Sequence, residues 1–364
     1  MAKKILSSAN RIIRKNRPRI NADKVCDVFV SNELLEIGFL SKQCTNDAKG
    51  SCIMCDYGCA NETRDIEVYI EEMRKIIKKH NDFDLLLLCT NGSFMDSKQI
   101  SDDLFFSILN EANKYSFSTL EIETHYQNVT REKLDTIRQI VKEKKVCIEM
   151  GLETVNENIQ NKYIMKNISM QKLKNKIDLI HSYGYETDIN IMLGMPFLSV
   201  KEQLEDALVT SDWVFENNSN LIVFPMNIKP FTLLFHMYET GFYQPISHWL
   251  MIEFLNKIPI KHLGKITVAW YGNREEKYEG SEKRVVFPSS CPNCHENIFH
   301  FYYEFNKSSS SDSRKTLIKE LIQNRKCKCY DELFKTLNSV EKGNNDDAYL
   351  QYINIVKKEF NIKE

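Results

Sequence analysis

Long apolar runs, proline and glycine are all scarce in this sequence. The 364 residues include only 8 Pro and 12 Gly, and no stretch approaches the about 18 consecutive apolar residues of a membrane-spanning helix. The basic opening segment, residues 1–20, lacks the apolar stretch and the small-residue cleavage site of a secretory signal. These absences predict a soluble, globular, cytoplasmic protein with no membrane segment.

An excess of charge of one sign is also missing. Lys and Arg number 49 and Asp and Glu number 50, for a net charge of −1, which excludes a whole-molecule field that draws nucleic acid. A local patch is left open, because residues 11–24 form a dense basic run. Such runs are most often solvated faces or mobile arms, and specific RNA contact is the minority alternative. The basic positions of this run include Arg11, Arg14, Lys15, Arg17 and Arg19.

Cysteine is abundant, and its number and distribution exclude a disulfide framework. Eleven cysteines cannot all pair within one chain, and a reducing compartment disfavours disulfides. Three lie singly in apolar surroundings and suit a packed core, namely Cys26, Cys89 and Cys147. The others form an early cluster and a late cluster, made of Cys44, Cys52, Cys55 and Cys59, and of Cys291, Cys294, Cys327 and Cys329.

The segment between the clusters alternates short apolar runs with amphipathic ones, which predicts βα units. Helices are expected at 65–79, at 130–145 with Thr130 as the cap, and at 201–218. Six strands buried in a parallel sheet are expected at 34–40, 84–89, 118–123, 146–151, 187–194 and 220–227. The predicted fold is therefore α/β, a partial (βα)6 barrel of the TIM type with a small C-terminal cysteine-rich appendage.

Three regions follow from this pattern. We expect a basic N-terminal extension at 1–33, the partial barrel at 34–285 and the four-cysteine helical appendage at 286–364. Within the appendage, the serine-rich stretch 306–313 reads as a flexible loop.

Two features of the sequence converge on the carboxyl ends of the strands, where ligands bind in parallel α/β folds. The early cysteines follow the first predicted strand directly. The next strand ends in "CTNGSFMD", residues 89–96, whose polar side chains and glycine suit a binding rim. Three thiolates can hold a cubane iron–sulfur cluster with one iron open, whereas four would close it or form a structural zinc site. The four-cysteine zinc alternative, using Cys59, is the lesser one because it does not explain the six βα units.

The early motif, C-x7-C-x2-C spelled "CTNDAKGSCIMC", resembles the radical S-adenosylmethionine superfamily in the branch with an expanded first gap, which includes the elongator catalytic subunit. The likeness is greatest to the archaeosine synthase radical enzymes. It extends over about residues 20–335 and includes the late CxxC and CxC. Its further motifs are "SCIMCDY" at 51–57, "TNGSFMD" at 90–96, "GLET" at 151–154 and "GMPFLSVKEQ" at 194–203.

The resemblance implies a role for each matching residue. Cys44, Cys52 and Cys55 would hold a 4Fe-4S cluster whose open iron binds S-adenosyl-L-methionine. The other cofactor contacts would be Asn91, Gly92, Ser93 and Phe94 at the methionine amino group, Glu153 and Asn156 near the ribose or carboxylate, Asn190 and Gly194 flanking the adenine, and Met54 packing on it.

Polar residues at the end of the third predicted strand are candidates for handling the substrate. Glu123 and Gln127 could bind its polar groups, and His125 could act as acid or base. Structural hydrogen bonding is the favoured interpretation of each until its geometry is known.

The late cysteines are interpreted as a structural zinc site. The spacing C-x2-C, 32 residues, C-x-C suits tetrahedral zinc, but the long gap and the CxC differ from the usual zinc ribbon. An auxiliary iron–sulfur cluster is the alternative.

The resemblance predicts radical chemistry more firmly than it predicts a substrate. Where archaeosine synthase-like members carry "KRGPHNC", this chain reads "EGSEKRVVFPSSC", without the glycine and the histidine. Archaeosine-type modification of a 7-deazaguanine in tRNA is the most concrete expectation. The alternatives are another tRNA modification of the elongator-related kind, a small-molecule or peptide biosynthetic reaction, and a non-catalytic zinc-dependent RNA-binding protein. A flavodoxin or ferredoxin is the expected reductant.

Overall fold

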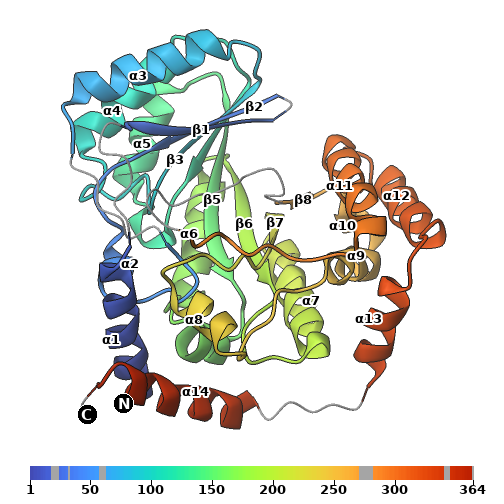
Figure 1. Cartoon of the computed structure of the whole chain (residues 1–364). Coiled ribbons are helices and arrows are strands. Elements are labelled where there is room, and N and C mark those ends of the chain that lie inside the picture. Colours follow the sequence, from blue (N-terminus) through green and yellow to red (C-terminus); the bar gives the residue numbers. More distant parts are fainter. Residues whose placement is uncertain (18–23, 32, 57–62, 270–281, 340–344, 363–364) are drawn as a thin grey trace.

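One curved sheet of eight strands forms the centre of the molecule (Figure 1). The computed structural model describes residues 1–17, 24–31, 33–56, 63–269, 282–339 and 345–362. The strands follow one another in chain order across the sheet. They are β1 (Cys26–Ser31), β2 (Leu34–Phe39), β3 (Leu85–Thr90), β4 (Thr119–Glu123), β5 (Lys145–Glu153), β6 (Glu186–Leu193), β7 (Asn220–Pro225) and β8 (Ile266–Val268).

The sheet is parallel from β2 to β8, and β1 pairs antiparallel with β2 at its edge. Because β1 and β8 stand at opposite ends of the strand order, the sheet is an open partial barrel. The predicted fold class and all six predicted strands, β2 to β7, are confirmed. The structure adds β1, an edge strand with half of its positions exposed, and β8, which has three residues.

Amphipathic helices cover the outer face of the sheet (Figure 1). Ser101, Thr130 and Ser199 each accept a hydrogen bond from a first-turn backbone N–H and so begin α4, α5 and α7. Thr130 was the predicted cap. The covering helices are α3 (Ile66–Lys79), α4 (Asp102–Ala112), α5 (Arg131–Ile140), α6 (Met170–Ser182) and α7 (Val200–Glu216).

The two faces of the sheet differ in burial. Outward side chains such as Leu35, Leu86 and Leu120 are fully buried under the helices. Inward side chains alternate with them, and many are only half buried, as the pattern of β7 shows from Asn220 to Phe224. A closed TIM barrel fills its interior with packed side chains. Here the concave face of the open sheet is reached by solvent.

Helices after β7 extend the molecule on the α7 side, where the late cysteines lie (Figure 1). The expected flexible loop at 306–313 is wrong in most of its length. Helix α11 continues to Lys307 and α12 begins at Ser311, because the Ser310 hydroxyl accepts from the N–H of Ser313 and caps α12. The helices of this part are α9 (His248–Lys257), α10 (Ile260–Leu263), α11 (Pro292–Lys307), α12 (Ser311–Gln323) and α13 (Cys329–Asn338).

A second hydrophobic core joins the two ends of the chain. Helix α1 (Ala2–Lys15) packs against α14 (Asn345–Glu359) and α8 (Leu233–Glu239), so the termini lie side by side (Figure 1). We call this group of buried side chains the second core; its members include Leu6, Ile53, Met165, Phe197 and Tyr352. We call the buried side chains between the sheet and its covering helices the main core; its members include Leu35, Leu86 and Leu120. The predicted appendage 286–364 thus contributes to two places, α11–α13 to the main core and α14 to the second core. The domain boundaries stay predictions.

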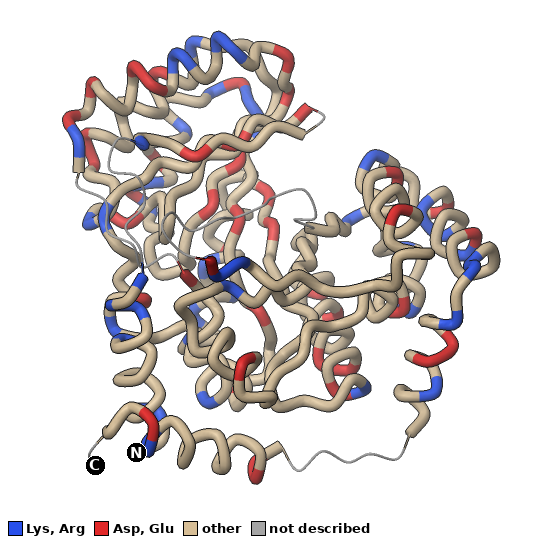
Figure 2. The backbone as a smooth tube through the Cα atoms, in the orientation of Figure 1, with Lys and Arg blue, Asp and Glu red and all other residues tan. Residues whose placement is uncertain are grey.

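Lysines and arginines are interspersed with acidic residues over the helices (Figure 2). Among the described residues, no helix combines the length and the apolar character that crossing a membrane requires.

Candidate active site

The early cysteines lie on a loop that leaves β2 at its carboxyl end. Cys44 precedes the short helix α2 (Thr45–Ala48), and the chain then turns through Cys52, whose φ is +55°. Backbone hydrogen bonds fix the turn: Cys52 N–H donates to the Met165 carbonyl (3.3 Å) and Cys55 N–H to the Cys52 carbonyl (3.0 Å). Between them, Ile53 accepts from Leu234 N–H (3.1 Å). The loop is therefore held from the segment after β5 and from α8. Cys59 lies outside the described residues.

Arg14 of α1 binds the same loop through its guanidinium group. Its guanidinium donates to the carbonyl oxygens of Ser51 (2.9 Å), Cys52 (2.9 Å) and Cys55 (3.1 Å). It also forms an ion pair with Asp47, whose side chain is 1% exposed. The basic run was expected to be solvated or mobile, and this expectation is wrong for Arg14, whose side chain is only 8% exposed. Arg19, in the same run, lies outside the described residues.

Charges of both signs surround the cysteine thiols: Lys166 favours the thiolate of Cys52, whereas Asp47 and Asp56 add to the burial that raises the pKa of Cys55. Burial raises the pKa of Cys52 to about 12, and Lys166 opposes this increase most strongly. Burial also lowers the pKa of Lys166, but Glu153, with which it forms an ion pair, and the thiols of Cys52 and Cys55 outweigh this and raise it. Buried thiols that are protonated on their own become ligands when a metal replaces the proton, and nearby cations favour the thiolate form. The donor set thus fits a metal cluster with thiolate ligands, and Lys166 and Lys229 supply positive charge near Cys52 and Cys55.

A second ion pair joins the cysteine loop to the end of β7. Asp56, directly after Cys55, lies 2.8 Å from the Lys229 ammonium and 3.5 Å from the Arg17 guanidinium. The carboxyl ends of the strands form the mouth of the barrel. The cysteine loop, which follows β2, is therefore tied to the β7 side of this mouth as well as to α1.

The predicted cofactor residues after β3 join the ends of neighbouring strands. Asn91 Oδ1 accepts from the N–H of Ser41 (3.3 Å) and from the Thr90 hydroxyl (3.2 Å), which links β3 to β2. Ser93 Oγ accepts from the N–H of His125 (3.0 Å) and from Asn128 Nδ2 (2.7 Å), which links β3 to β4. The side-chain oxygens of Asn91 and Ser93 therefore join the ends of neighbouring strands and fix the shape of the rim.

The glycine and the phenylalanine of "NGSF", Gly92 and Phe94, have different structural roles. A Cβ at Gly92 would lie 2.1 Å from Gln99 Oε1, so the Gln99 side chain occupies the room that glycine leaves. Phe94 is fully buried between the rings of Phe39 and Phe105, at centroid distances of 5.8 and 5.6 Å. Phe94 is therefore a core residue that supports the rim.

The other predicted cofactor residues lie on and beyond β5 and β6. Glu153 follows an irregularity in the β5–β6 pairing and has a φ of +70°. Asn156 is exposed, and its Oδ1 accepts from the N–H groups of Asn158 (3.0 Å) and Ile159 (3.2 Å) at the turn Ile159–Tyr163. Asn190 is buried and donates to Glu149 Oε1 (2.6 Å). Glycine is required at 194, because its φ is +110° and a Cβ would lie 2.7 Å from Ile246 Cγ2.

Met54 lies in the second core and is 7% exposed. Its side chain packs among the apolar residues beneath the cysteine loop. Contact with an adenine ring stays a prediction for this residue.

The three predicted substrate residues differ in burial. Glu123 is partly buried, and burial with the charge of Glu36 raises its pKa to about 7. Burial and the charge of Lys166 lower the pKa of His125 to about 4, so its ring is neutral near pH 7. His125 Nδ1 accepts from the N–H of Gln127 (3.3 Å), which leaves the proton on Nε2. Gln127 is exposed and donates to the Tyr126 hydroxyl (3.3 Å).

The four late cysteines come together although the chain separates them into two pairs. Cys291 is the N-cap of α11, and Cys329 begins α13. The four thiol sulfurs lie within 4.8 Å of one another, and the pair Cys291 and Cys294 is 3.5 Å apart. Zn–S bonds of about 2.3 Å place tetrahedral ligands about 3.8 Å apart, so this set fits one ion. Hydrogen bonds from Cys329 and Cys294 lower the pKa of Cys291 to about 7, which favours a first thiolate there.

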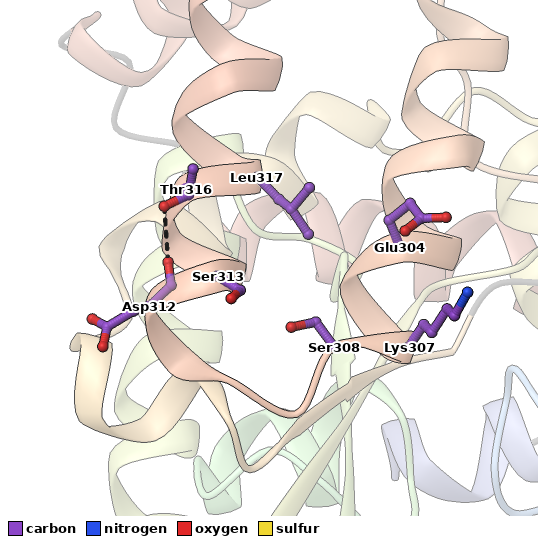
Figure 3. Close-up of a pocket in the computed structure, with 7 residues that line it drawn as sticks. All are labelled: Glu304, Lys307, Ser308, Asp312, Ser313, Thr316 and Leu317. Carbon is purple, nitrogen blue, oxygen red and sulfur yellow. Dashed lines mark hydrogen bonds between the residues drawn. The ribbon is translucent and has the colours of Figure 1, made fainter.

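A surface pocket of about 560 Å³ lies elsewhere, between α11 and α12 (Figure 3). It is lined by polar side chains such as Lys307, Ser308 and Asp312, and it contains none of the residues predicted to bind cofactor or substrate. The candidate site is therefore the barrel mouth with the cysteine loop.

Comparison with known proteins agrees with the motifs. No family model matches the chain. Archaeosine synthase subunit beta of Methanosarcina acetivorans is 27% identical over 238 residues, which cover 64% of this chain and 69% of the relative. The protein of the same name from Thermococcus kodakarensis is 25% identical over 228 residues, 58% of this chain and 69% of the relative. The predicted resemblance to archaeosine synthase is confirmed.

Among solved structures, the Elp3 of Methanocaldococcus infernus is similar, with 14% identity and a TM-score of 0.47. The match covers 66% of this chain and 59% of that structure. The fold assignment rests on the strand order of this chain and not on this similarity.

Three residues of the site were missed from the sequence, namely Arg14, Asp47 and Lys166. Asp47 lies inside the first cysteine gap and Lys166 13 residues after Glu153, so neither stands in a motif. Arg14 had a signal in the sequence, because the polar residues Ser7, Asn10 and Arg14 recur at helical spacing and so share one face of α1. In the structure, all three donate hydrogen bonds to the cysteine loop.

Proposed function

We propose that this chain is a radical S-adenosylmethionine enzyme that holds a 4Fe-4S cluster through Cys44, Cys52 and Cys55. The observation that carries the proposal is the cysteine loop, with three thiols in a C-x7-C-x2-C pattern at the carboxyl edge of an open parallel sheet. When bound there, such a cluster would supply one electron to the sulfonium of S-adenosylmethionine, and breaking of the C5′–S bond would give methionine and the 5′-deoxyadenosyl radical.

The residues of the chain position the reactants. Arg14 and the backbone ties of Cys52 fix the loop, and Lys166 offsets the charge of the thiolates. The backbone at residues 91–94 and the side chain of Glu153 are assigned to S-adenosylmethionine. His125, neutral with its proton on Nε2, is assigned to donate a hydrogen bond to the substrate rather than a proton, because its pKa is about 4.

The most concrete substrate is a 7-deazaguanine base of tRNA, modified in an archaeosine-type reaction. The names of the two relatives and the shared motifs support this assignment. Because both relatives are named as a beta subunit, the proposal includes a partner subunit. A flavodoxin or ferredoxin is the proposed reductant, and the cytoplasm the proposed location.

A small-molecule or peptide substrate is the second candidate. It is favoured by the segment before Cys291, which lacks the glycine and histidine of the archaeosine synthase-like pattern. The tRNA assignment therefore has a test separate from that of the radical chemistry.

The late cysteines are proposed to bind structural zinc. Their compact arrangement supports one tetrahedral ion, which would join the beginning of α11 to the beginning of α13.

The decisive experiment is anaerobic reconstitution with iron and sulfide, followed by dithionite and S-adenosylmethionine and chromatography for 5′-deoxyadenosine. The wild type should form 5′-deoxyadenosine, Cys55→Ala should not, and Cys26→Ala, which removes a buried thiol of β1, should retain the activity. An iron-replete wild type that forms none refutes the proposal.

The substrate is tested in the same assay. Adding tRNA that carries a lysine-modified 7-deazaguanine should stimulate 5′-deoxyadenosine formation and change the base. Basal 5′-deoxyadenosine formation without stimulation would transfer the assignment to the second candidate.

A further inference from the structure

The concave face of the sheet carries a row of acidic side chains. Glu123 of β4 is in register with Glu149 of β5, and Glu149 with Asp188 of β6. Glu121 lies one inward position deeper on β4, in register with Cys147. Side chains in register on neighbouring parallel strands point to the same face, so these four carboxyl groups line one surface. Figure 2 shows the acidic positions along the central strands.

The row is crowded with carboxyl groups at its deep end. Glu121 is 7% exposed and Glu149 is 5% exposed. Burial raises the pKa of both, and the next contributions are other carboxylates: Asp188 and Glu123 for Glu121, Glu123 and Glu121 for Glu149. Lys166 and Lys229 act on Glu123 nearer the mouth, where they are paired with Glu153 and Asp56. The deep carboxyl groups are thus short of positive charge.

Two acceptor atoms at this row lack donors. Asn190 is 7% exposed and donates through Nδ2 to Glu149 Oε1 (2.6 Å), while its Oδ1 has no hydrogen-bond partner. Glu121 Oε1 is likewise buried without a partner. Leaving a buried polar atom without a hydrogen-bond partner is unfavourable, so native proteins usually provide one. What is missing here is a donor, and next to carboxylates a charged donor is the most favourable.

We propose that Glu121, Glu149, Asp188 and Asn190 form a binding site for a primary ammonium group of the substrate. An ammonium carries three donors and one positive charge, which matches the free acceptors and the surrounding carboxylates. The face is reached by solvent through the half-buried inward positions, of which Asp188 is one. The assignment to the substrate rests on the proposed function, whereas binding of an ammonium group does not.

A divalent metal ion is the competing occupant. The ligand atoms of Glu121, Cys147 and Asp188 lie within 4.8 Å of one another. However, Asp188 Oδ1 already accepts from the Cys147 thiol (3.1 Å) and from Asn220 Nδ2 (2.9 Å). The atoms without hydrogen-bond partners are the buried Oδ1 of Asn190 and Oε1 of Glu121, which lack a donor rather than a metal.

The experiment is isothermal titration calorimetry of the whole protein near pH 7 with pentan-1-amine, and with pentan-1-ol as the uncharged control. The amine should bind at least about tenfold more tightly than the alcohol, because hydrogen bonds from a charged donor are stronger than those from a neutral hydroxyl. Binding should also release protons from the carboxyl groups, seen as a dependence of the heat on the ionisation enthalpy of the buffer.

The variants separate a binding role from a structural one. Glu149→Gln and Asp188→Asn keep the shape and relieve repulsion, so they should fold and should weaken amine binding about tenfold. Glu205→Gln, at an exposed acidic position of α7, should bind like the wild type. Equal affinity for amine and alcohol, absent saturation, or equal effects of all three variants would overturn the proposal.

The metal alternative has its own readout. One divalent ion per chain that survives dialysis and is lost in Cys147→Ala, with the late cysteines intact, would assign the row to a metal and overturn the proposal. None of these results depends on 5′-deoxyadenosine formation, so the proposed function can fail while the ammonium site stands.

Discussion

Arg14 of the first helix donates a hydrogen bond of 2.9 Å to the carbonyl oxygen of Cys52, in the centre of the cysteine loop. The same guanidinium reaches two further carbonyls of the loop and the carboxylate of Asp47. One side chain from the beginning of the chain thus satisfies acceptors over most of the loop. The N-terminal helix is therefore part of the proposed cluster site.

Replacing Arg14 by Met should weaken both folding and cluster retention. The change leaves Asp47 buried without its partner, and removing one member of a buried ion pair costs about 3 kcal/mol. Iron per chain after reconstitution and gel filtration should fall well below that of the wild type, and the denaturant midpoint should fall with it. Arg11→Met, at an exposed position of the same helix, is the control and should leave both unchanged. Full iron retention in Arg14→Met would show that the loop holds its shape without α1.

Removing one late cysteine should release zinc and loosen the α11–α13 region. Cys294 is buried among the four thiols, and Cys294→Ser leaves three ligands. An ion present at about a hundredfold excess over its Kd stabilises a fold by about 2.7 kcal/mol. We expect zinc, measured by mass spectrometry, to fall from one per chain toward none, with a lower Tm. Cys26→Ser should keep its zinc, and zinc retained in Cys294→Ser would refute the assignment.

The strands that were predicted and those that were missed differ in burial. The run at 84–89 predicted β3 because a strand covered by helices excludes polar residues from its outward face, and Leu86 and Leu88 are fully buried there. Strand β1 lies at the edge, with Asp27 and Val28 exposed, so its sequence carries no such signal. Strand β8 has three residues, too few for a period to be recognised.

The site was predicted in part because motifs report local chemistry and not distant contacts. The cysteine spacing predicted the loop after β2, and the four late thiols were expected to meet. The role of Arg14 arises from contacts over 37 to 41 residues, which composition does not reveal. The serine-rich stretch 306–313 misled because serine favours both loops and helix caps, and Ser310 is a cap here.

The pKa of Glu123 gives the free energy of unfolding a pH dependence. Burial and Glu36 raise this pKa to about 7 from the ordinary value of 4.5. Between these values the folded chain holds a proton that the unfolded chain releases, so stability falls as pH rises through this range. Glu123→Gln should lose a few kcal/mol less than the wild type between pH 4.5 and pH 8, as measured by urea unfolding. Identical pH profiles would mean that Glu123 titrates near its ordinary value.

Tyr352 of α14 connects the C-terminal helix to the stability of the cysteine loop. It is fully buried, and its hydroxyl hydrogen-bonds to His236 Nδ1 (2.9 Å) within the second core that also contains Ile53 and Met54. Removing a large buried ring costs about 3–5 kcal/mol. Because Ile53 and Met54 lie between Cys52 and Cys55, Tyr352→Ala should also speed the release of iron to a chelator.

Tyr302→Ala is the matched control for this effect. Tyr302 is equally buried and is also hydrogen-bonded to a histidine, His248 (3.1 Å), but it belongs to the main core. Its loss should destabilise the fold by a similar amount and leave iron release from the early cysteines slow. If both variants release iron at the same rate, global unfolding controls the release. Faster release in Tyr352→Ala alone would mean that the second core holds the proposed cluster ligands in place.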